Sequence, residues 1–296
     1  MDTIKHEKIE GVYELTAPQN ALPLVFDSPH SGQDYPEDFR FTCPVEILKN
    51  AEDNDVESFF LNAADYGGSF IHALFPRTYI DVNRAADDID PDLLAEAWPH
   101  DYNPSDRAHA GIGLIRRIVR PGITLYDRKL TVAEIKHRID TYYMPYHNKL
   151  EQLIEDAHYS YGQVWHVNCH SMPAAGRPTG FVRRTVSHSL ADFVLGDRNG
   201  SSCDLHFTHS MRDLLRGMGY RVDINNPYKG VELVKRHGQP TTGRHSIQLE
   251  INKALYWDEQ NHCRNRNYEN LKADIETLIE FCADYVRANL NQMAAD

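Results

Sequence analysis

The sequence has few of the compositional features that assign a protein directly to a functional class. Positive charge is scarce, because 31 Lys and Arg residues face 43 Asp and Glu residues and leave a net charge of −12. Since nucleic-acid binding depends on a clustered basic face, this balance argues against a nucleic-acid partner. No apolar run approaches the roughly 20 residues of a membrane-spanning helix, and no apolar leader follows Met1, so we expect no membrane association and a cytoplasmic location.

Cysteine is also scarce. The chain has 5 cysteines, an odd number, and none forms a CxxC pair, which argues against a disulfide framework or a zinc ribbon. Internal repeats, low-complexity stretches and linkers are missing as well, and 296 residues can bury an ample core. We therefore expect one domain over residues 1–296, with residues 1–20 as a loosely paired lead-in and residues 85–130 as a long loop or lid.

Two apolar runs end in a histidine followed by a serine. The first covers residues 21–32 and contains His30, and the second covers residues 164–173 and contains His170. Short apolar runs bounded by turn residues are typical of strands buried on both faces, and open α/β sheets bind ligands beyond the carboxyl ends of such strands. Each histidine alone is more typical of a hydrogen-bonded loop histidine than of a metal ligand. The matched pair favours a metal site, because metal binding is the commonest reason to bring two neutral imidazoles together.

Carboxylates that could complete such a site occur in two places. Residues 44–66 are predicted to form a helix. The acids at positions 52, 53, 55 and 57 either lie in solvent at the helix start, where the helix dipole favours negative charge, or supply a metal ligand. The strand predicted over residues 245–252 places Gln248 and Glu250 on one face and apolar residues on the other. A buried carboxylate is costly unless it is paired or used. Two histidines, a carboxylate and a further acid that takes a proton from water form the set that open-site zinc hydrolases need.

Arginines in a neighbouring stretch suit the recognition of an anionic substrate. Strands are expected over residues 69–75 and 78–82, with Arg77 between them and Asn83-Arg84 directly after the second. A guanidinium fork beside an amide can bind a carboxylate through two hydrogen bonds. The spacing alone allows a structural salt bridge equally well.

The remaining pattern alternates strands and helices, as in α/β proteins. A Thr131–Glu134 capping box opens a helix that is expected to run to about residue 161, with a kink or break at Pro145. A closing amphipathic helix is expected over residues 267–290. Shorter elements are predicted outside these helices. A strand or hairpin is expected within residues 112–119, an irregular basic segment at 176–189 and a strand that starts at residue 193. A helix capped by Ser201 or Ser202 is expected to end near residue 218, followed by a strand at 220–224 and a short helix ending near residue 236.

Several short motifs, taken together, resemble those of the N-formylglutamate amidohydrolase (deformylase) family. They occur in family order and are Ser28-Pro29-His30-Ser31-Gly32, Arg77-Thr78-Tyr79-Ile80-Asp81-Val82-Asn83-Arg84, Cys169-His170-Ser171-Met172-Pro173, Leu195-Gly196-Asp197-Arg198, Asn226-Pro227-Tyr228-Lys229-Gly230 and Gln248-Leu249-Glu250. The resemblance implies a single α/β domain with a mostly parallel mixed sheet flanked by helices, similar to zinc carboxypeptidases and aspartoacylase-like deacylases (phosphorylase/hydrolase-like folds). It also implies metal-dependent cleavage of N-formyl-L-glutamate to formate and L-glutamate, a step in histidine degradation.

The resemblance also implies a ligand set for the metal. His30 and His170 match the family's metal histidines, and Asp53 matches the acidic ligand when the motif is aligned with Glu57 at its later acid. Asp55 stays open as the ligand, and so does Glu57, because the local pattern is degenerate. The expected cofactor is a divalent metal, Zn2+, and the expected partner is a small-molecule N-acyl amino acid.

The other roles that the resemblance implies concern chemistry and substrate binding. Glu250 matches the general base, and Asn83-Arg84 resembles a carboxylate-binding pair. Arg77 is a further predicted contact of the α-carboxylate. The side-chain carboxylate of the substrate needs a second cation, for which the predicted residues are Arg198 and Lys229.

One departure from the family pattern affects the predicted substrate. The loop usually contains Tyr-Lys-Gly-Gly, and here Val231 replaces the second glycine, which alters the loop if that position needs a positive φ. Two other functions therefore stay open. The first is a related metal-dependent amidase that acts on another N-acyl amino acid or a peptide. The second is a metal-free binding protein of the same fold. This alternative is disfavoured because the two histidines, the acidic ligand and Glu250 are all retained.

Overall fold

A mixed sheet of 8 strands forms the centre of the molecule, in the order β1-β2-β4-β3-β7-β10-β8-β9. The computed structural model describes residues 3–174 and 191–293, so the segment predicted to be irregular at 176–189 lies outside the described residues. The central strands β4, β3, β7 and β10 run parallel, and antiparallel pairs occur towards both edges. The strands are β1 (Ile4–Ile9), β2 (Tyr13–Pro18), β3 (Leu24–Ser28), β4 (Ser69–Ala73), β7 (Val164–Met172), β8 (Phe193–Gly196), β9 (Val222–Ile224) and β10 (Arg244–Asn252).

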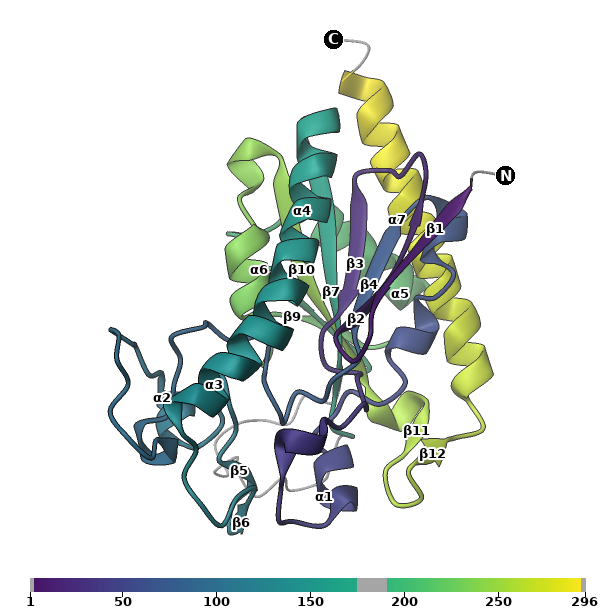
Figure 1. The fold of residues 1–296 in the computed structure, drawn as a ribbon. Helices are drawn as coiled ribbons and strands as arrows, with labels where there is room; N and C mark the ends of the chain where they lie inside the picture. Colours follow the sequence, from purple (N-terminus) through teal and green to yellow (C-terminus); the bar gives the residue numbers. More distant parts are fainter. Residues whose placement is uncertain (1–2, 175–190, 294–296) are drawn as a thin grey trace.

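Helices cover both faces of this sheet (Figure 1). One face carries α4 (Met144–Tyr161) and α6 (Glu232–His237), and the other carries α5 (Leu205–Gly217) and α7 (Tyr268–Met293). Alternate residues of β3 and β4 enter two separate cores, whereas β7 and β10 direct apolar residues into one core and buried polar residues to the opposite face. The predicted α/β architecture is confirmed. No helix in the described ranges is long and apolar enough to cross a membrane.

The polar ends of the central strands are surrounded by short elements at one end of the sheet (Figure 1). These are α1 (Val45–Lys49), α2 (Asp106–His109), β5 (Ile118–Arg120), β6 (Ile123–Thr124), β11 (Trp257–Asp258) and β12 (Cys263–Arg264). Residues 85–130 contain α2, β5 and β6 and are tied to the preceding segment. The Asp81 amide donates to Leu114 O and the Leu114 amide donates to Asp88 O, both at 2.8 Å. This segment is therefore folded against the rest of the domain.

The long helix predicted from the capping box is confirmed in two parts. The Thr131 side chain and Glu134 form the predicted box at the start of α3 (Val132–Arg138). A π-helical turn over Ile139–Tyr143 then joins α3 to α4 just before Pro145. Since proline has no amide proton, a wider turn at this point absorbs the missing helical hydrogen bond.

Two predictions about the amino-terminal half need correction. The described part of residues 1–20 is paired, as predicted, but it is not a loose lead-in, because β1 and β2 form a regular antiparallel pair and β2 joins the main sheet beside β4. Residues 78–82 are not a strand: the Tyr79 amide donates to Pro76 O at 2.9 Å, and the Arg84 amide donates to Asp81 O at 3.1 Å. Successive turns bury every side chain from residue 78 to residue 84, including Asp81 and Asn83.

Two helix predictions also need correction. The helix expected over residues 44–66 breaks into α1 and two short 3-10 turns. The cap of α5 is Asp204, whose side chain accepts from two backbone amides, while Ser202 donates to Ser246 O at 2.8 Å. The strand and hairpin elements near residues 118, 193, 222 and 244 and the closing helix agree with the predictions within a few residues.

Candidate metal and substrate site

The site lies where the parallel strands β3, β7 and β10 end. Polar residues alternate with apolar ones on β7 and β10, so that His166, Asn168 and His170 share one face with Gln248 and Glu250. In the parallel register, Glu250 lies beside His170. A cavity of about 890 Å³ opens over these residues. Its position at the carboxyl edge of a parallel sheet is the usual position for ligands in such folds.

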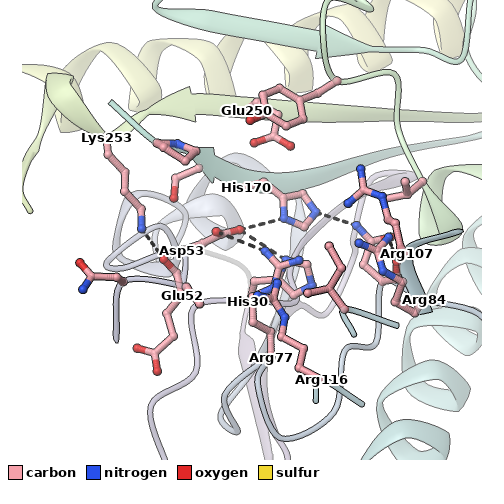
Figure 2. Close-up of a pocket in the computed structure, with 18 of the residues that line it drawn as sticks. His30, Glu52, Asp53, Arg77, Arg84, Arg107, Arg116, His170, Glu250 and Lys253 are labelled. Carbon is pink, nitrogen blue, oxygen red and sulfur yellow. Dashed lines mark hydrogen bonds and ion pairs between the residues drawn. The ribbon is translucent and has the colours of Figure 1, made fainter. Parts of the chain in front are cut away.

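Three buried side chains meet in the wall of this cavity (Figure 2). One potential ligand atom from each of His30, Asp53 and His170 lies within 4.8 Å of the other two. His170 Nδ1 is 2.9 Å from Asp53 Oδ2, and His30 Nδ1 is 3.5 Å from the same oxygen. The structure therefore brings together the histidine pair and the acid that the sequence predicted as a metal site.

The far nitrogen of each imidazole is held by a protein group. His30 Nε2 is 2.6 Å from Asp81 Oδ1, and His170 Nε2 is 2.7 Å from Asn168 Oδ1. With the proton on Nε2, the Nδ1 of each ring, which lies beside Asp53, is free to bind a metal. The Nδ1 of His30 is buried without a hydrogen-bond partner among the described residues. Imidazole held by an outer carboxylate or amide is the usual arrangement of metal-ligating histidine.

A deeper polar network supports His170. Asn168 donates through Nδ2 to Asp27 Oδ1 at 2.8 Å, which directs its Oδ1 at His170. His166 Nε2 contacts the same Asp27 oxygen at 2.8 Å, and Tyr146 from α4 donates to Asp27 Oδ2 at 2.9 Å. All these side chains are buried. The network fixes the ring orientation of His170 through contacts that cross from α4 to two strands.

The broken helix explains how Asp53 reaches the histidines. The Asp53 amide donates to His30 O at 3.0 Å, which ties this acid to the end of β3. Asp55 has a positive φ of 61° and forms an ion pair with Arg264 Nε at 2.6 Å. Glu57 begins the next 3-10 turn and is not part of the group. Of the acids that the sequence left open, Asp53 is the one beside both histidines.

Burial and neighbouring charges set the ionisation of these groups. Burial opposes the ionised form of Asp53, but contacts with His170 and His30 and the charge of Arg77 hold its pKa well below the ordinary value. Burial lowers the pKa of His170, which favours the neutral ring that a metal requires. Burial and the negative charge of Asp53 raise the pKa of Glu250 well above the ordinary value.

The predicted substrate residues divide into two sets. Arg77, Asn83 and Arg84 line the cavity. Arg198 does not line it, and its Nη1 donates to Gly230 O at 3.2 Å. The exposed Lys229 does line the cavity.

Both polar atoms of the Asn83 side chain already contact other residues of the protein. Its Oδ1 accepts from the Leu233 amide at 3.0 Å, and its Nδ2 lies 3.0 Å from His170 Nε2. The Arg77 guanidinium forms ion pairs with Asp81 at 2.9 Å and with Asp53 at 3.7 Å. Each side chain therefore contacts one member of the group formed by His30, Asp53 and His170, which is called the metal-type group below.

The replacement of glycine by Val231 has a simple structural account. Val231 has a φ of −117°, which any L-residue adopts, whereas the preceding Gly230 has a φ of 88°. A Cβ on the neighbouring Gly196 would lie 2.7 Å from Gly230 N. The positions that need glycine are thus retained.

The sequence did not point to several residues of the site. Asp81 had a signal, since it lies two positions before Asn83 in a quoted motif, but the wrong strand prediction hid its contact with His30. Arg107, Arg116, Glu52 and Lys253 also line the cavity (Figure 2). Lys253 is buried and donates to Glu52 O and to Asn54 Oδ1.

Comparison with known proteins agrees with this geometry. Residues 22–257 match the sequence profile of the family described as N-formylglutamate amidohydrolase, which is well over half of the chain. The chain belongs to this family. The predicted resemblance is confirmed, and the range shared by N-formylglutamate amidohydrolases contains the metal-type group and Glu250.

Individual relatives of this N-formylglutamate amidohydrolase family support the assignment. The crystal structure of N-formylglutamate amidohydrolase from Ralstonia eutropha JMP134 is 42% identical, with a TM-score of 0.90 over 94% of this chain and 99% of that chain. N-formylglutamate deformylase of Pseudomonas putida is 26% identical over 250 residues, which are 81% of this chain and 84% of the relative. The Pseudomonas aeruginosa deformylase is 27% identical over 260 residues, 83% of this chain and 86% of the relative. The Agrobacterium tumefaciens gene product Atu2144, at 15% identity and a TM-score of 0.63 over 96% of this chain and 95% of that chain, shares the fold.

Proposed function

We propose that this protein hydrolyses N-formyl-L-glutamate to formate and L-glutamate, with Zn2+ held by His30, Asp53 and His170. Family membership supports the reaction. The observation that carries the metal dependence is the buried His-Asp-His group in the wall of the cavity. Within the proposal, the reaction is the histidine-degradation step that the family resemblance implies.

The donor set fits a divalent metal. The buried Nδ1 of His30 lacks a hydrogen-bond partner among the described residues, and Nδ1 of His170 lies 2.9 Å from a carboxylate oxygen of Asp53. A cation between these groups satisfies both, and two imidazoles with one carboxylate are a common protein ligand set of catalytic zinc. When bound, such a metal acidifies water and polarises a carbonyl oxygen.

We assign proton transfer to Glu250. Its carboxyl group lies in the cavity beside His170 but outside the three-residue group (Figure 2). Its raised pKa suits a carboxylate that takes up a proton near neutral pH. Glu250 accepts a proton from the attacking water and passes it to the amide nitrogen as the C–N bond breaks.

Substrate binding depends mainly on the glutamate end, because a formyl group offers little surface to bind. We assign the α-carboxylate to Arg84, which is buried, lines the cavity and has no ion-pair partner among the described residues. Asn83 and Arg77 then act as positioning residues for His170 and Asp53. This revises the carboxylate contacts that the sequence predicted for both.

Replacing Arg84 with Ala is expected to raise KM for N-formylglutamate by about 10- to 100-fold, because a charge-assisted hydrogen bond is lost. The metal content should stay unchanged, since Arg84 contacts none of the ligand atoms. Steady-state formate release and zinc analysis measure both quantities. Arg198→Ala serves as the contrast and should keep KM close to wild type, because Arg198 does not line the cavity. A larger effect at Arg198 than at Arg84 would contradict the assignment.

Replacing Asp81 with Asn is expected to weaken zinc binding by about 10- to 100-fold, as is typical for the outer partner of a ligating histidine. The change removes the negative charge that holds His30 Nε2 while it preserves side-chain volume. Competition with a chromophoric chelator measures the affinity. Asp90→Asn is a matched control, because Asp90 is equally buried and paired with Arg117 at 2.6 Å, away from the ligands. Wild-type zinc affinity in Asp81→Asn would remove Asp81 from the site.

The reaction itself is tested with a substrate panel. Formate release from N-formylglutamate should exceed that from N-formylmethionine and N-formylglutamine, and N-acetylglutamate should release acetate slowly or not at all. Preference for another N-acyl amino acid would favour a related amidase. Binding of N-formylglutamate without turnover by the zinc-loaded protein would instead favour a binding protein of this fold.

A further inference from the structure

The wall of the cavity carries more positive than negative side chains. Its carboxylates are Glu52, Asp53, Glu250 and Glu259, and its cations are Arg77, Arg84, Arg107, Arg116, Arg120, Lys229 and Lys253. One of the carboxylates, Asp53, belongs to the metal-type group. An excess of cations in a partly desolvated cavity favours a ligand that carries more than one negative charge.

The arginines differ in how far the protein already neutralises them. Arg77 pairs with Asp81 and Asp53. Arg84 and Arg116 form no ion pair with the described residues, and the Nε of each is buried without a hydrogen-bond acceptor. Residues 175–190, which are outside the described set, contain no Asp or Glu. The exposed cations of the wall also form no ion pair with the described residues; they are Arg107, Arg120 and Lys229. Arg84 and Arg116 are thus the arginines of the cavity wall that are at least partly withdrawn from solvent and lack a partner anion.

The backbone at Arg116 is held in place by its neighbours. Arg116 pairs with Ile112 in an isolated antiparallel bridge, and Leu114 bonds through its amide and its carbonyl to residues 88 and 81. The adjacent Arg117 is fixed by its ion pair with Asp90 at 2.6 Å. Arg116 therefore enters the cavity from a fixed segment, separate from the strand ends that carry the metal-type group.

Arg116 is also held among like charges. Burial and the positive charges of Arg77 and Arg84 lower its pKa to about 9, although Asp81 and Asp53 act in the opposite direction. An unpaired cation in such a place is destabilised relative to water, and a bound anion relieves that cost. The same argument does not hold for an exposed cation, which water already solvates.

We propose that Arg116 binds the side-chain carboxylate of the substrate, so that Arg84 and Arg116 together select N-formyl amino acids with an acidic side chain. The inference rests on the proposed function in one respect, that the substrate occupies this cavity. A planar guanidinium can bind a carboxylate through two parallel hydrogen bonds, which discriminates against an amide or an apolar group at the same position.

Other cations of the cavity suit this role less well. Arg107 and Lys229 are exposed to solvent, where an ion pair contributes little. Lys253 already donates to Glu52 O and Asn54 Oδ1. Arg77 is neutralised by two carboxylates. Arg116 combines a place in the cavity wall, a buried Nε and the lack of a partner.

The test compares substrates that differ in one charge. In Arg116→Met, kcat/KM for N-formylglutamate should fall by about 10- to 100-fold, while kcat/KM for N-formylglutamine should change little. Arg84→Met should lower both values together, since both substrates carry the α-carboxylate. Arg116→Lys should restore part of the preference for N-formylglutamate. Equal losses for both substrates in Arg116→Met, or an unchanged ratio, would overturn the inference.

A binding measurement separates this inference from the proposed reaction. Glutarate, a dicarboxylate without an amide bond, should bind wild type in calorimetry and bind Arg116→Met about 10- to 100-fold more weakly. If wild type binds glutarate through Arg116 but releases no formate from N-formylglutamate, the reaction is wrong and the carboxylate site stands. Equal glutarate affinity in wild type and Arg116→Met would overturn the site whatever the reaction.

Discussion

Replacing Glu250 with Gln is expected to reduce kcat for N-formylglutamate by about 10²- to 10⁴-fold, the usual effect of losing a general acid–base. The amide keeps the size of the side chain but cannot take a proton from water. Metal content and KM should stay near wild type, because Glu250 is not part of the His-Asp-His group. Steady-state kinetics and zinc analysis on the same samples separate the two effects.

Glu259→Gln is the matched control for this change. Glu259 lines the same cavity and loses the same charge, but it is not adjacent to His170 in the sheet register. Its kcat should remain close to wild type. Loss of zinc in Glu250→Gln would place Glu250 among the ligands, and near-normal turnover would remove it from the mechanism.

Replacing His30 or His170 with Ala should weaken zinc binding by more than the roughly 10- to 100-fold expected for an outer partner such as Asp81. Each change removes one of three ligand atoms that lie within 4.8 Å of one another. Formate release should fall with zinc occupancy. Zinc content after dialysis, measured by elemental analysis, gives the occupancy of each variant.

His245→Ala controls for the loss of an imidazole outside the site. His245 packs on Trp165 at a centroid distance of 5.0 Å, and it does not line the cavity. This variant should retain zinc even if its stability falls. Circular dichroism spectra of the ligand variants should match wild type. Stoichiometric zinc in both His30→Ala and His170→Ala would place the metal elsewhere.

The part of the site that the sequence predicted depends on local, periodic information. Residues 24–28 and 164–172 are strand-like runs that become buried parallel strands, and the positions of His30 and His170 follow from where those runs end. Glu250 follows from the alternation of one strand, since residues 247, 249 and 251 all enter the apolar core. Alternation of apolar and polar residues with a period of two is a local pattern, so it can be recognised in a single sequence.

The part that was missed depends on tertiary contacts. The helix expected over residues 44–66 breaks because Asp53 is tied to His30 O, and its local sequence gives no sign of this contact. Asp81 is buried by turns that lie in a stretch of strand-like residues. Arg116 belongs to the long connection over residues 85–130, which has little regular periodicity, and the strand or hairpin predicted within residues 112–119 does not show which side chain faces a cavity. Departures from local preference at a functional site are what physical chemistry leads one to expect.

Zinc titration of the apoprotein, with formate release from N-formylglutamate recorded at each addition, tests the central claim most directly. The protein is first dialysed against a chelator and its residual metal is determined. The account predicts that apoprotein releases no formate, and that activity rises linearly with zinc to a plateau at one zinc per chain. Full formate release by protein that holds no metal would contradict it, and so would a zinc-saturated protein that releases none.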